Sequence, residues 1–397
     1  MTLNSSVNNI ISDNKSLGNL CQHLEECQFV CIDTEFMREG TYWPNLCLIQ
    51  LADPGGDTFI IDPLTPEIEL KPFFGLLKKK ELLKIFHAAR QDLEIFFNLT
   101  GSVPTPIFDT QIVAMVCGFG DSASYETLAK QLAGARLDKS SRFSNWSSRP
   151  LEKRQLSYAR SDVAHLPKIY EELQKTLLDT GRTNWVKEET ENLCSTDLYT
   201  LKPENAWERI KSRNAKPKTL AVLREVAAVR ETWARQLNIP RQRLIKDESL
   251  LEVASSCPNN TAQLGRIRGF SEKAAKGKLG SDFLKAITRG ANVPREQYPS
   301  PNIRRDTVNA SGAVVDLLKV LLKLKCEQHG VAQKLVAKNS DLVQIAAGHT
   351  SVKALTGWRY SIFGSDALKL CNGTISLHVS SGEISISTIE SGIKIHG

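Results

Sequence analysis

Three apolar runs near the N-terminus have the pattern of β-strands. They cover residues 29–33, 46–52 and 58–61, and the turn sequence Asp53-Pro54-Gly55-Gly56 separates the last two. Short runs rich in Val, Ile and Leu that are bounded by such turn residues are typical of strands. A short helix over 16–27 precedes them. We therefore expect a three-stranded antiparallel meander after an initial helix.

The pattern then changes to strands that alternate with helices. The elements expected there are a helix over 66–79, a strand over 83–86, a helix over 90–98, a strand near Ile107, and helices over 110–117, 124–133 and 151–178. Strands in succession followed by strand–helix alternation predict an α/β domain with a mixed sheet. We expect five strands in this sheet and place the domain at 1–205.

Beyond about residue 205 the chain becomes helical and contains an internal repeat. After a polar, basic linker over 211–219, the segment that starts at Leu237 aligns with the segment that starts at His329, an offset of 92 residues. Both copies keep the spacing Lys-x-x-x-Leu-x-x-x-Ala. In the sequence these residues are Lys246, Leu250 and Ala254, and Lys338, Leu342 and Ala346. Such a repeat predicts a duplicated small helical domain, each copy with a modest core of its own.

The two helical copies are expected at 206–292 and 300–372. The remaining tail, 373–397, alternates apolar and polar residues on both sides of Ser381-Gly382. This alternation around a turn predicts a terminal β-hairpin. It carries no candidate chemistry.

Charge is distributed unevenly along the 397 residues. The chain has a net charge of +7. Residues 205–305 contain 21 Lys and Arg against 9 Asp and Glu, so this segment carries +12 and the remainder −5. The asymmetry indicates a module that binds a polyanion. A solvated helical surface is the alternative explanation.

Composition narrows the class of protein further. Hydrophobic residues make up 41% and charged residues 24%, which is typical of a soluble globular protein. No apolar run approaches the ~18 residues of a membrane span, and the polar N-terminus lacks the pattern of a signal peptide. The nine cysteines stand mostly among apolar neighbours, without the spacing of a zinc site. We therefore expect buried, reduced thiols in a cytoplasmic protein that does not associate with membranes.

One predicted strand carries two acids. Asp33 and Glu35 interrupt the apolar run that begins at Val30, and in a strand residues i and i+2 point to the same face. Two adjacent carboxylates repel each other, and burying them unpaired is costly. They are therefore either solvated or paired with Arg38, or they hold a hard divalent cation such as Mg²⁺ or Mn²⁺.

Further acids stand at a predicted strand–helix junction. Asp92 lies in the first turn of the expected helix, where the helix dipole favours a negative charge in any case. His87, at the end of the preceding strand, is compatible with a partly buried structural role. Asp109 is expected to cap the next helix and to do no more. None of these residues defines a site alone.

A third group lies in the expected helix 151–178. Tyr158 and Asp162 are four residues apart and so share a helix face. The alternative is a tyrosine of the core beside a surface acid. The pair indicates a functional site only in combination with the other acids.

Together, these three groups resemble the motifs of the DEDD 3′–5′ exonucleases, in the subgroup with tyrosine in the last motif. The longer runs around them resemble the bacterial ribonuclease D family. They are Asp33–Glu39, Thr41–Pro44, Leu46–Ala52, His87–Glu94, Leu137–Ser140, Asn145–Leu151 and Tyr158–Val163. The two helical copies are similar to the HRDC domain (the helicase-and-RNase-D C-terminal domain), a nucleic-acid-binding module. The implied fold is a ribonuclease H-like exonuclease domain followed by two all-α HRDC-like domains.

The resemblance also implies roles for individual residues. Asp33, Glu35, Asp92 and Asp162 would hold two divalent ions, Mg²⁺ or Mn²⁺, and Tyr158 would orient the attacking water. The residues that would meet the substrate are Phe36, Met37, His87, Lys139 and Trp146. For Phe36 and Met37, packing in the core is an equally good explanation.

We therefore expect a metal-dependent 3′–5′ exoribonuclease. It would trim the 3′ ends of structured RNAs such as tRNA precursors, release nucleoside 5′-monophosphates and act as a monomer. An exonuclease acting on DNA is one alternative, but the tandem HRDC-like domains and the lack of polymerase or helicase motifs argue against it. A non-catalytic RNA-binding protein with a relic site is another. The intact set of four acids and Tyr158 argues against that.

Overall fold

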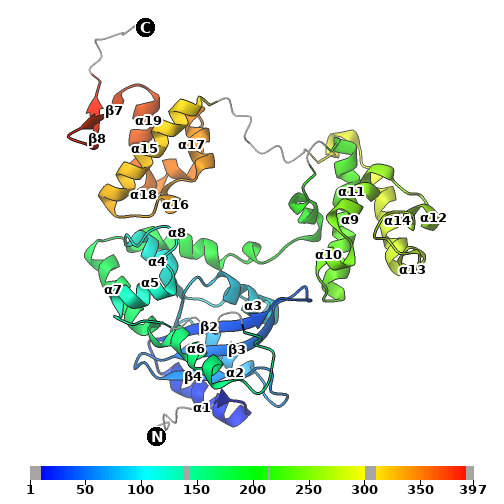
Figure 1. The fold of residues 1–397 in the computed structure, drawn as a ribbon, viewed down its shortest axis with the longest axis horizontal. Coiled ribbons are helices and arrows are strands. Elements are labelled where there is room, and N and C mark those ends of the chain that lie inside the picture. Colours follow the sequence, from blue (N-terminus) through cyan, green and yellow to red (C-terminus); the bar gives the residue numbers. More distant parts are fainter. Residues whose placement is uncertain (1–9, 138–143, 213–214, 300–309, 390–397) are drawn as a thin grey trace.

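The computed structural model describes residues 10–137, 144–212, 215–299 and 310–389. An N-terminal α/β domain is followed by two separate helical units and a terminal hairpin (Figure 1). Among the helices of these described ranges, none is both long and apolar enough to cross a membrane.

A mixed sheet forms the centre of the first domain. Its strands are β1 (Ile10–Ile11), β2 (Phe29–Met37), β3 (Asn45–Ala52), β4 (Thr58–Ile61), β5 (Leu83–Phe86) and β6 (Ile107–Asp109), in the spatial order β1-β4-β3-β2-β5-β6. β2, β3 and β4 form the expected antiparallel meander, and β5 pairs parallel to β2. The prediction of five strands is wrong by one. The additional strand, β1, has two residues paired parallel to β4, too short to show any periodicity in the sequence.

Helices cover both faces of this sheet. They are α1 (Asn14–Glu25), α2 (Lys71–Leu77), α3 (Arg90–Thr100), α4 (Thr110–Val116), α5 (Tyr125–Leu132), α6 (Lys153–Ala164), α7 (Leu166–Asp179) and α8 (Thr183–Cys194). The long helix expected over 151–178 is in fact two, α6 and α7, which meet at His165. Pro167 lies in the first turn of α7, where its missing N–H does no harm, whereas inside a continuous helix it would remove a hydrogen bond. Nothing in the apolar pattern had indicated α8.

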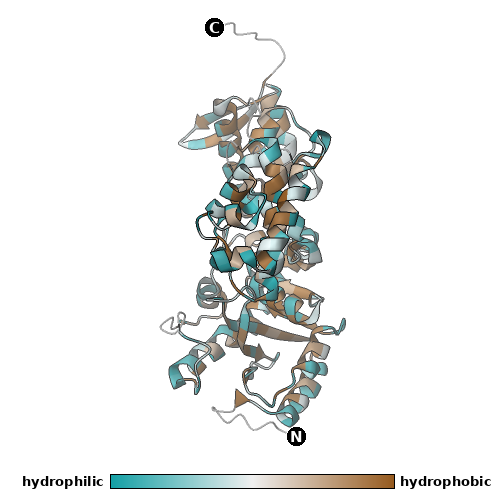
Figure 2. Ribbon diagram, turned by 90° about the vertical axis from the view of Figure 1, so that its right-hand side faces the viewer, coloured by the Kyte–Doolittle hydropathy of each residue, from teal (hydrophilic) through white to brown (hydrophobic). Residues whose placement is uncertain are grey.

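The two faces of the sheet differ in what covers them. Val30 and Ile32 of β2 belong to a large core with α1, α2 and α3, whereas Cys31 belongs to a smaller cluster that includes Val163 of α6 and Leu166 of α7. The strands are accordingly among the most apolar parts of the ribbon (Figure 2). The alternation along β2 therefore sends Asp33 and Glu35 to the face covered by α6.

The helices that follow form two units, each with its own core. The first contains α9 (Pro217–Gln236), α10 (Arg241–Leu244), α11 (Asp247–Ser256), α12 (Thr261–Leu264), α13 (Glu272–Lys276) and α14 (Lys278–Ala291). The second contains α15 (Gly312–His329), α16 (Gln333–Val336), α17 (Asn339–Ala346), α18 (Gly357–Arg359) and α19 (Ser365–Cys371). α10 and α11 recur as α16 and α17 at the offset seen in the sequence. The hairpin of β7 (Ile375–Ser380) and β8 (Glu383–Thr388) packs on the second core through Leu377 and Ile386.

The first helical unit is attached to the loop between β2 and β3. Glu231 of α9 is fully buried and accepts hydrogen bonds from the Tyr42 hydroxyl and the Arg241 guanidinium. The Asn238 side-chain oxygen accepts from the backbone N–H of both Tyr42 and Trp43 at 3.1 Å. Burial opposes ionisation of Glu231, but the hydrogen bonds from Arg241 and Tyr42 outweigh it, so the pKa of this carboxyl is lowered.

The second helical unit is attached to α8. The Trp185 and Trp358 rings are stacked, with centroids 4.4 Å apart. The Arg359 side chain is only 1% exposed and donates to Glu188 and Glu189 of α8 and, at 2.7 Å, to the Leu335 carbonyl. This buried guanidinium therefore fixes the orientation of the unit.

Replacing Arg359 tests the importance of that contact. Arg359→Leu removes the buried cation and leaves Glu188 and Glu189 with the partly exposed Lys353 as their cationic partner. We expect a loss of about 2–3 kcal/mol in the free energy of unfolding, less than for a fully buried pair, because both glutamates keep contact with solvent and with Lys353. Denaturation followed by tryptophan fluorescence, which reports on the Trp185–Trp358 stack, measures it.

The matched control is Lys319→Met, which breaks the exposed pair with Asp316 on α15. It should change stability by less than about 0.5 kcal/mol. Equal stabilities of the two variants would contradict the role assigned to Arg359.

Candidate active site

The first two acids lie on β2 at the centre of the sheet. Asp33 pairs with Gln50 and Glu35 with Leu48 across the ladder to β3. The register shifts after Glu35, where β3 has the additional residue Cys47. Burial, followed by the nearby charge of Asp162, raises the pKa of Asp33 well above its ordinary value.

Asp92 is presented by the junction between β5 and α3. The backbone there turns through Ala88, whose φ of 57° lies in the left-handed region that non-glycine residues rarely adopt. The Asp109 carboxylate accepts the N–H groups of Ala88 at 3.1 Å and Ala89 at 2.8 Å and so holds this turn. Asp109 also caps α4, as expected, by accepting from Gln111. Its second function, holding the turn, was not predicted.

Thr34 connects Asp92 to the acidic strand. It lies between Asp33 and Glu35 and points to the opposite face, where its hydroxyl donates to the Asp92 carboxylate. Burial, followed by the charge of Asp33, raises the pKa of Asp92 well above its ordinary value. The hydrogen bond from Thr34 only partly offsets this rise. Asp33 and Asp92 are thus electrostatically coupled.

Helix α6 provides the remaining predicted residues. The Tyr158 hydroxyl is hydrogen-bonded to the Asp162 side chain, as their separation of four residues allows. Burial first, then the charges of Asp162 and Glu35, raises the pKa of Tyr158. The hydroxyl therefore stays protonated and remains a hydrogen-bond donor at any physiological pH.

Both ends of α6 are fixed to the rest of the domain. Before the helix, the Arg149 guanidinium bonds to both oxygens of Asp62, at 2.6 and 2.7 Å, and to the Cys47 carbonyl of β3. At its other end, the Tyr125 hydroxyl donates to the Ser161 carbonyl and accepts from the His165 N–H. These contacts set the position of Tyr158 and Asp162 over the sheet.

Two of the four acids line one cavity together with Tyr158. It measures about 360 Å³ and is lined by Asp33, Tyr158, Asp162 and His87, with Tyr125 and Gln111 among its other walls. Glu35 lies close enough to Tyr158, and Asp92 to Asp33, to shift their pKa values. Three of the five predicted catalytic residues therefore line the cavity, and Glu35 and Asp92 lie close enough to them to interact electrostatically.

The residues predicted to meet the substrate are distributed differently. His87 lines the cavity, hydrogen-bonds to the Thr110 hydroxyl at 3.0 Å, and has its pKa lowered to about 4 by burial, so it is neutral. Phe36 packs against the core on the far face of the sheet, and Met37 packs against the small cluster that contains Trp146. Trp146 is 2% exposed and stands 6.0 Å from the Tyr158 ring, so in this conformation it supports Tyr158 and offers no face to a base. Lys139 lies outside the described residues.

The donor chemistry of this site fits a hard divalent cation. Carboxylate oxygens are the preferred ligands of such ions, and buried carboxylates that raise each other's pKa are stabilised by a positive charge. Within the described residues, however, no three His, Cys, Asp or Glu side chains are arranged so that they already enclose an ion. Metal binding would therefore require the side chains to draw together.

Several residues that shape the site were not predicted. Thr34, Tyr125, Arg149 and Asp62 act on the acids or on α6 through hydrogen bonds between segments far apart in the chain. Of these residues, only Thr34 could have been noticed in the sequence, because it lies between the two acids. The others could not be distinguished from ordinary polar residues before the fold was known.

Comparisons with known proteins identify the families to which the two main parts of the chain belong. Residues 8–178 match a family described as 3′-5′ exonuclease, and residues 219–287 match the HRDC domain. The first match contains all five predicted catalytic residues, and the second lies within the first helical unit.

The chain is also similar to curated proteins over nearly its whole length. It is 46% identical to ribonuclease D of Jannaschia sp. (strain CCS1), with 95% of this chain and 98% of that protein covered. Ribonuclease D of Granulibacter bethesdensis is likewise 46% identical, with 96% of each chain covered.

A solved structure extends the likeness to the fold. The Escherichia coli RNase D structure, described as an exoribonuclease involved in structured RNA processing, superposes with a TM-score of 0.77 at 26% identity. It covers 92% of this chain and 98% of that one. Both the predicted family and, apart from the strand count, the predicted fold are confirmed. The chain belongs to the ribonuclease D family and is a 3′–5′ exoribonuclease.

Proposed function

We propose that this exoribonuclease hydrolyses RNA from the 3′ end at the cavity lined by Asp33, Tyr158 and Asp162. The observation that carries the proposal is the convergence of these residues, with Glu35 and Asp92 beside them, around one cavity of about 360 Å³. The product is a nucleoside 5′-monophosphate, because the attacked phosphate stays with the terminal nucleoside.

Exonucleases of this family generally depend on divalent metal ions. We infer that Asp33, Glu35, Asp92 and Asp162 hold two such ions, Mg²⁺ or Mn²⁺. When bound, a metal pair lowers the pKa of the attacking water and stabilises both the attacking and the leaving oxygen of the displacement. Cation binding would also relieve the repulsion between the buried carboxylates.

The Tyr158 hydroxyl is placed to orient the attacking water. Because its proton is directed to Asp162, a lone pair of the phenol oxygen is free to accept a hydrogen bond within the cavity. The raised pKa makes Tyr158 a positioning group and a poor general base. Neutral His87, on the same cavity wall, can contact the terminal nucleotide without adding charge.

We propose structured RNAs such as tRNA precursors as the substrates. The relative from Escherichia coli is described as acting in structured RNA processing. The +12 segment at 205–305 supplies Lys and Arg for phosphate contacts along such an RNA. We further propose that the protein acts as a monomer in the cytoplasm, where its nine free cysteines would stay reduced.

A chain-shortening assay tests the activity and the preference for RNA. The full-length protein is incubated with 5′-labelled single-stranded RNA or with DNA of the same sequence, with Mg²⁺ or Mn²⁺ and with chelator. We expect a ladder of shortened RNA that disappears with chelator, and a tRNA precursor with a 3′ extension should also be trimmed. Asp162→Ala should lower the rate by at least about 10²-fold, since it removes a charged group at the reacting centre.

The matched control is Glu171→Gln, which changes an exposed acid on α7 and should leave the ladder intact. Equal shortening of the DNA would favour the alternative of a DNA exonuclease. RNA binding without any shortening would contradict the proposed hydrolysis.

Tyr158→Phe tests the positioning of the water. Loss of one hydroxyl that contacts charged groups should lower kcat by about 10- to 100-fold while KM changes little. Steady-state kinetics on the same RNA measure this split. A rise in KM at unchanged kcat would instead indicate that Tyr158 binds the substrate.

The raised pKa values predict how the metal-free protein responds to pH. Asp33 and Asp92 have folded-state pKa values well above the ordinary 3.8, so the folded state binds protons more tightly than the unfolded chain. Their contribution to stability is complete below that ordinary value and is lost as pH rises through the folded-state values. Chelator-treated protein should therefore lose stability progressively as the pH rises above this ordinary value.

Asp33→Asn and Asp92→Asn should each flatten this dependence and raise the Tm at neutral pH while abolishing activity. Thermal unfolding across the pH range measures the effect. Parallel stability profiles for the wild type and both variants would show that the two carboxyls do not titrate differently on folding.

A further inference from the structure

Gln50 is a buried polar residue that has no role in the hydrolysis proposed above. It lies in β3, in the apolar run Leu46–Ala52, and its exposure is 0%. Neither its side-chain oxygen nor its side-chain nitrogen has a hydrogen-bond partner among the described residues. Buried amides are nearly always satisfied, so a doubly unpartnered one calls for an explanation.

The register of the sheet places Gln50 beside one acid. On one side Gln50 pairs directly with Asp33 of β2, and on the other with Ile60 of β4. Directly paired residues of antiparallel strands point to the same face, with Cβ atoms about 4.5–5.5 Å apart. The amide therefore shares the face on which Asp33 meets α6.

Along its own strand the neighbours of Gln50 on this face are apolar, whereas Glu35 lies diagonally across from it on β2. Along β3, the flanking positions are Leu48 and Ala52, and Ala159 of α6 packs with Leu48 and Ile60. Asp33 is thus the one ionisable side chain directly paired with Gln50, and its carboxylate can accept a hydrogen bond from the amide.

We propose that Gln50 is a positioning residue for Asp33: its Nε2 donates to one carboxylate oxygen and directs the other toward the divalent cation. The inference rests on the metal binding proposed above. In this proposal the Gln50 amide finds its hydrogen-bond partner only when metal is bound, because the carboxylates must then draw together. A partner that orients a metal-binding carboxylate typically contributes 10- to 100-fold to metal affinity.

Two apolar variants of the full-length chain test this assignment. Gln50→Met keeps the length of the side chain, and Gln50→Leu repeats the test with a different shape. Isothermal titration with Mn²⁺, in the absence of RNA, measures the dissociation constant directly, and thermal unfolding of chelator-treated protein measures the fold. The control is Ile60→Val, which perturbs the packing on the opposite side of Gln50 without removing a hydrogen-bonding group.

We expect both Gln50 variants to bind Mn²⁺ about tenfold more weakly than the wild type. Their metal-free Tm should be unchanged or higher, because the unpartnered amide gives the metal-free fold no hydrogen bond to lose. Their RNA-shortening rate should recover at saturating Mn²⁺. Ile60→Val should bind Mn²⁺ as tightly as the wild type.

An unchanged dissociation constant in both Gln50 variants would overturn the proposal. A lowered metal-free Tm with wild-type Mn²⁺ affinity would also overturn it and make the amide a structural group. Failure of the wild-type chain itself to bind Mn²⁺ would refute the proposed metal chemistry, and this inference with it.

Discussion

Mutual repulsion of buried carboxylates is the constraint on which the rest of the exonuclease domain depends. Burial, followed by the charge of Asp33 on Asp92 and of Asp162 on Asp33, raises the pKa of both carboxyls, so the folded chain must hold together groups that would otherwise separate. Its secondary structure supplies the restraint. Asp109 fixes the turn before α3, and Tyr125 holds the end of α6. The fold thus holds these carboxylates together at an electrostatic cost, as is common at functional sites.

Much of this arrangement could be predicted from the sequence because it is local. Period-two alternation in a strand places Asp33 and Glu35 on one face, and a four-residue spacing in a helix pairs Tyr158 with Asp162. What could not be predicted depends on contacts between distant segments. The burial of Trp146 under α6 and the hydrogen bond from Thr34 to Asp92 exist only once the helices have packed. Likewise, a two-residue strand such as β1 has no pattern to detect.

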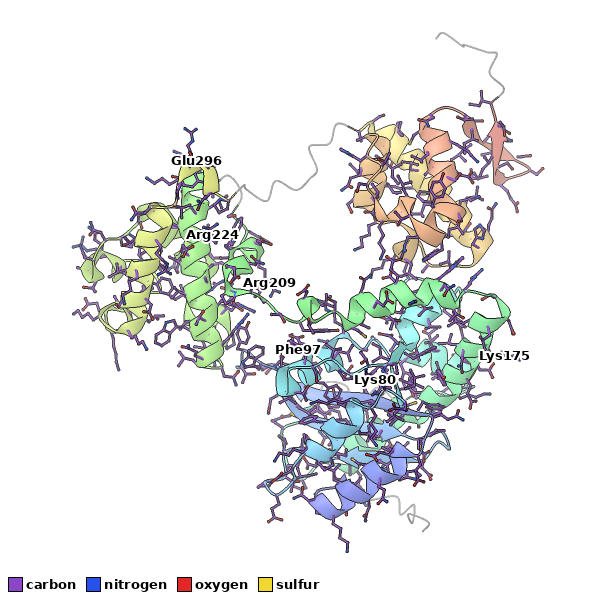
Figure 3. The ribbon with its side chains drawn as sticks, turned by 180° about the vertical axis from the view of Figure 1, so that it is seen from behind. Lys80, Phe97, Lys175, Arg209, Arg224 and Glu296 are labelled. Atoms are coloured by element: carbon purple, nitrogen blue, oxygen red, sulfur yellow. The ribbon has the colours of Figure 1, made fainter. Side chains whose placement is uncertain are left out.

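The two helical units illustrate how a repeat can be conserved in its interior and differ at its surface. The short helices α10 and α16 recur at the same offset, but the units attach by different chemistry. The first uses buried Glu231 with Tyr42, and the second uses a tryptophan stack and Arg359. Figure 3 labels Phe97 of α3 and Arg209, which lie where the first domain and the first helical unit face each other. Both residues line one large, polar groove. Sequence similarity between the copies carries no information about these attachments.

The loop between β2 and β3 has a consequence for how this protein can change over time. Strand β2 of this hairpin carries Asp33 and Glu35, and the hairpin tip carries Tyr42 and Trp43. Asn238 and Glu231 of the first helical unit hold this tip. A substitution on the surface of α9 that shifts this tip therefore also pulls on the strand that carries half of the acids. The first helical unit and the strand of Asp33 and Glu35 are thus mechanically linked, so that a foreign unit would fit only together with a hairpin tip that matches it.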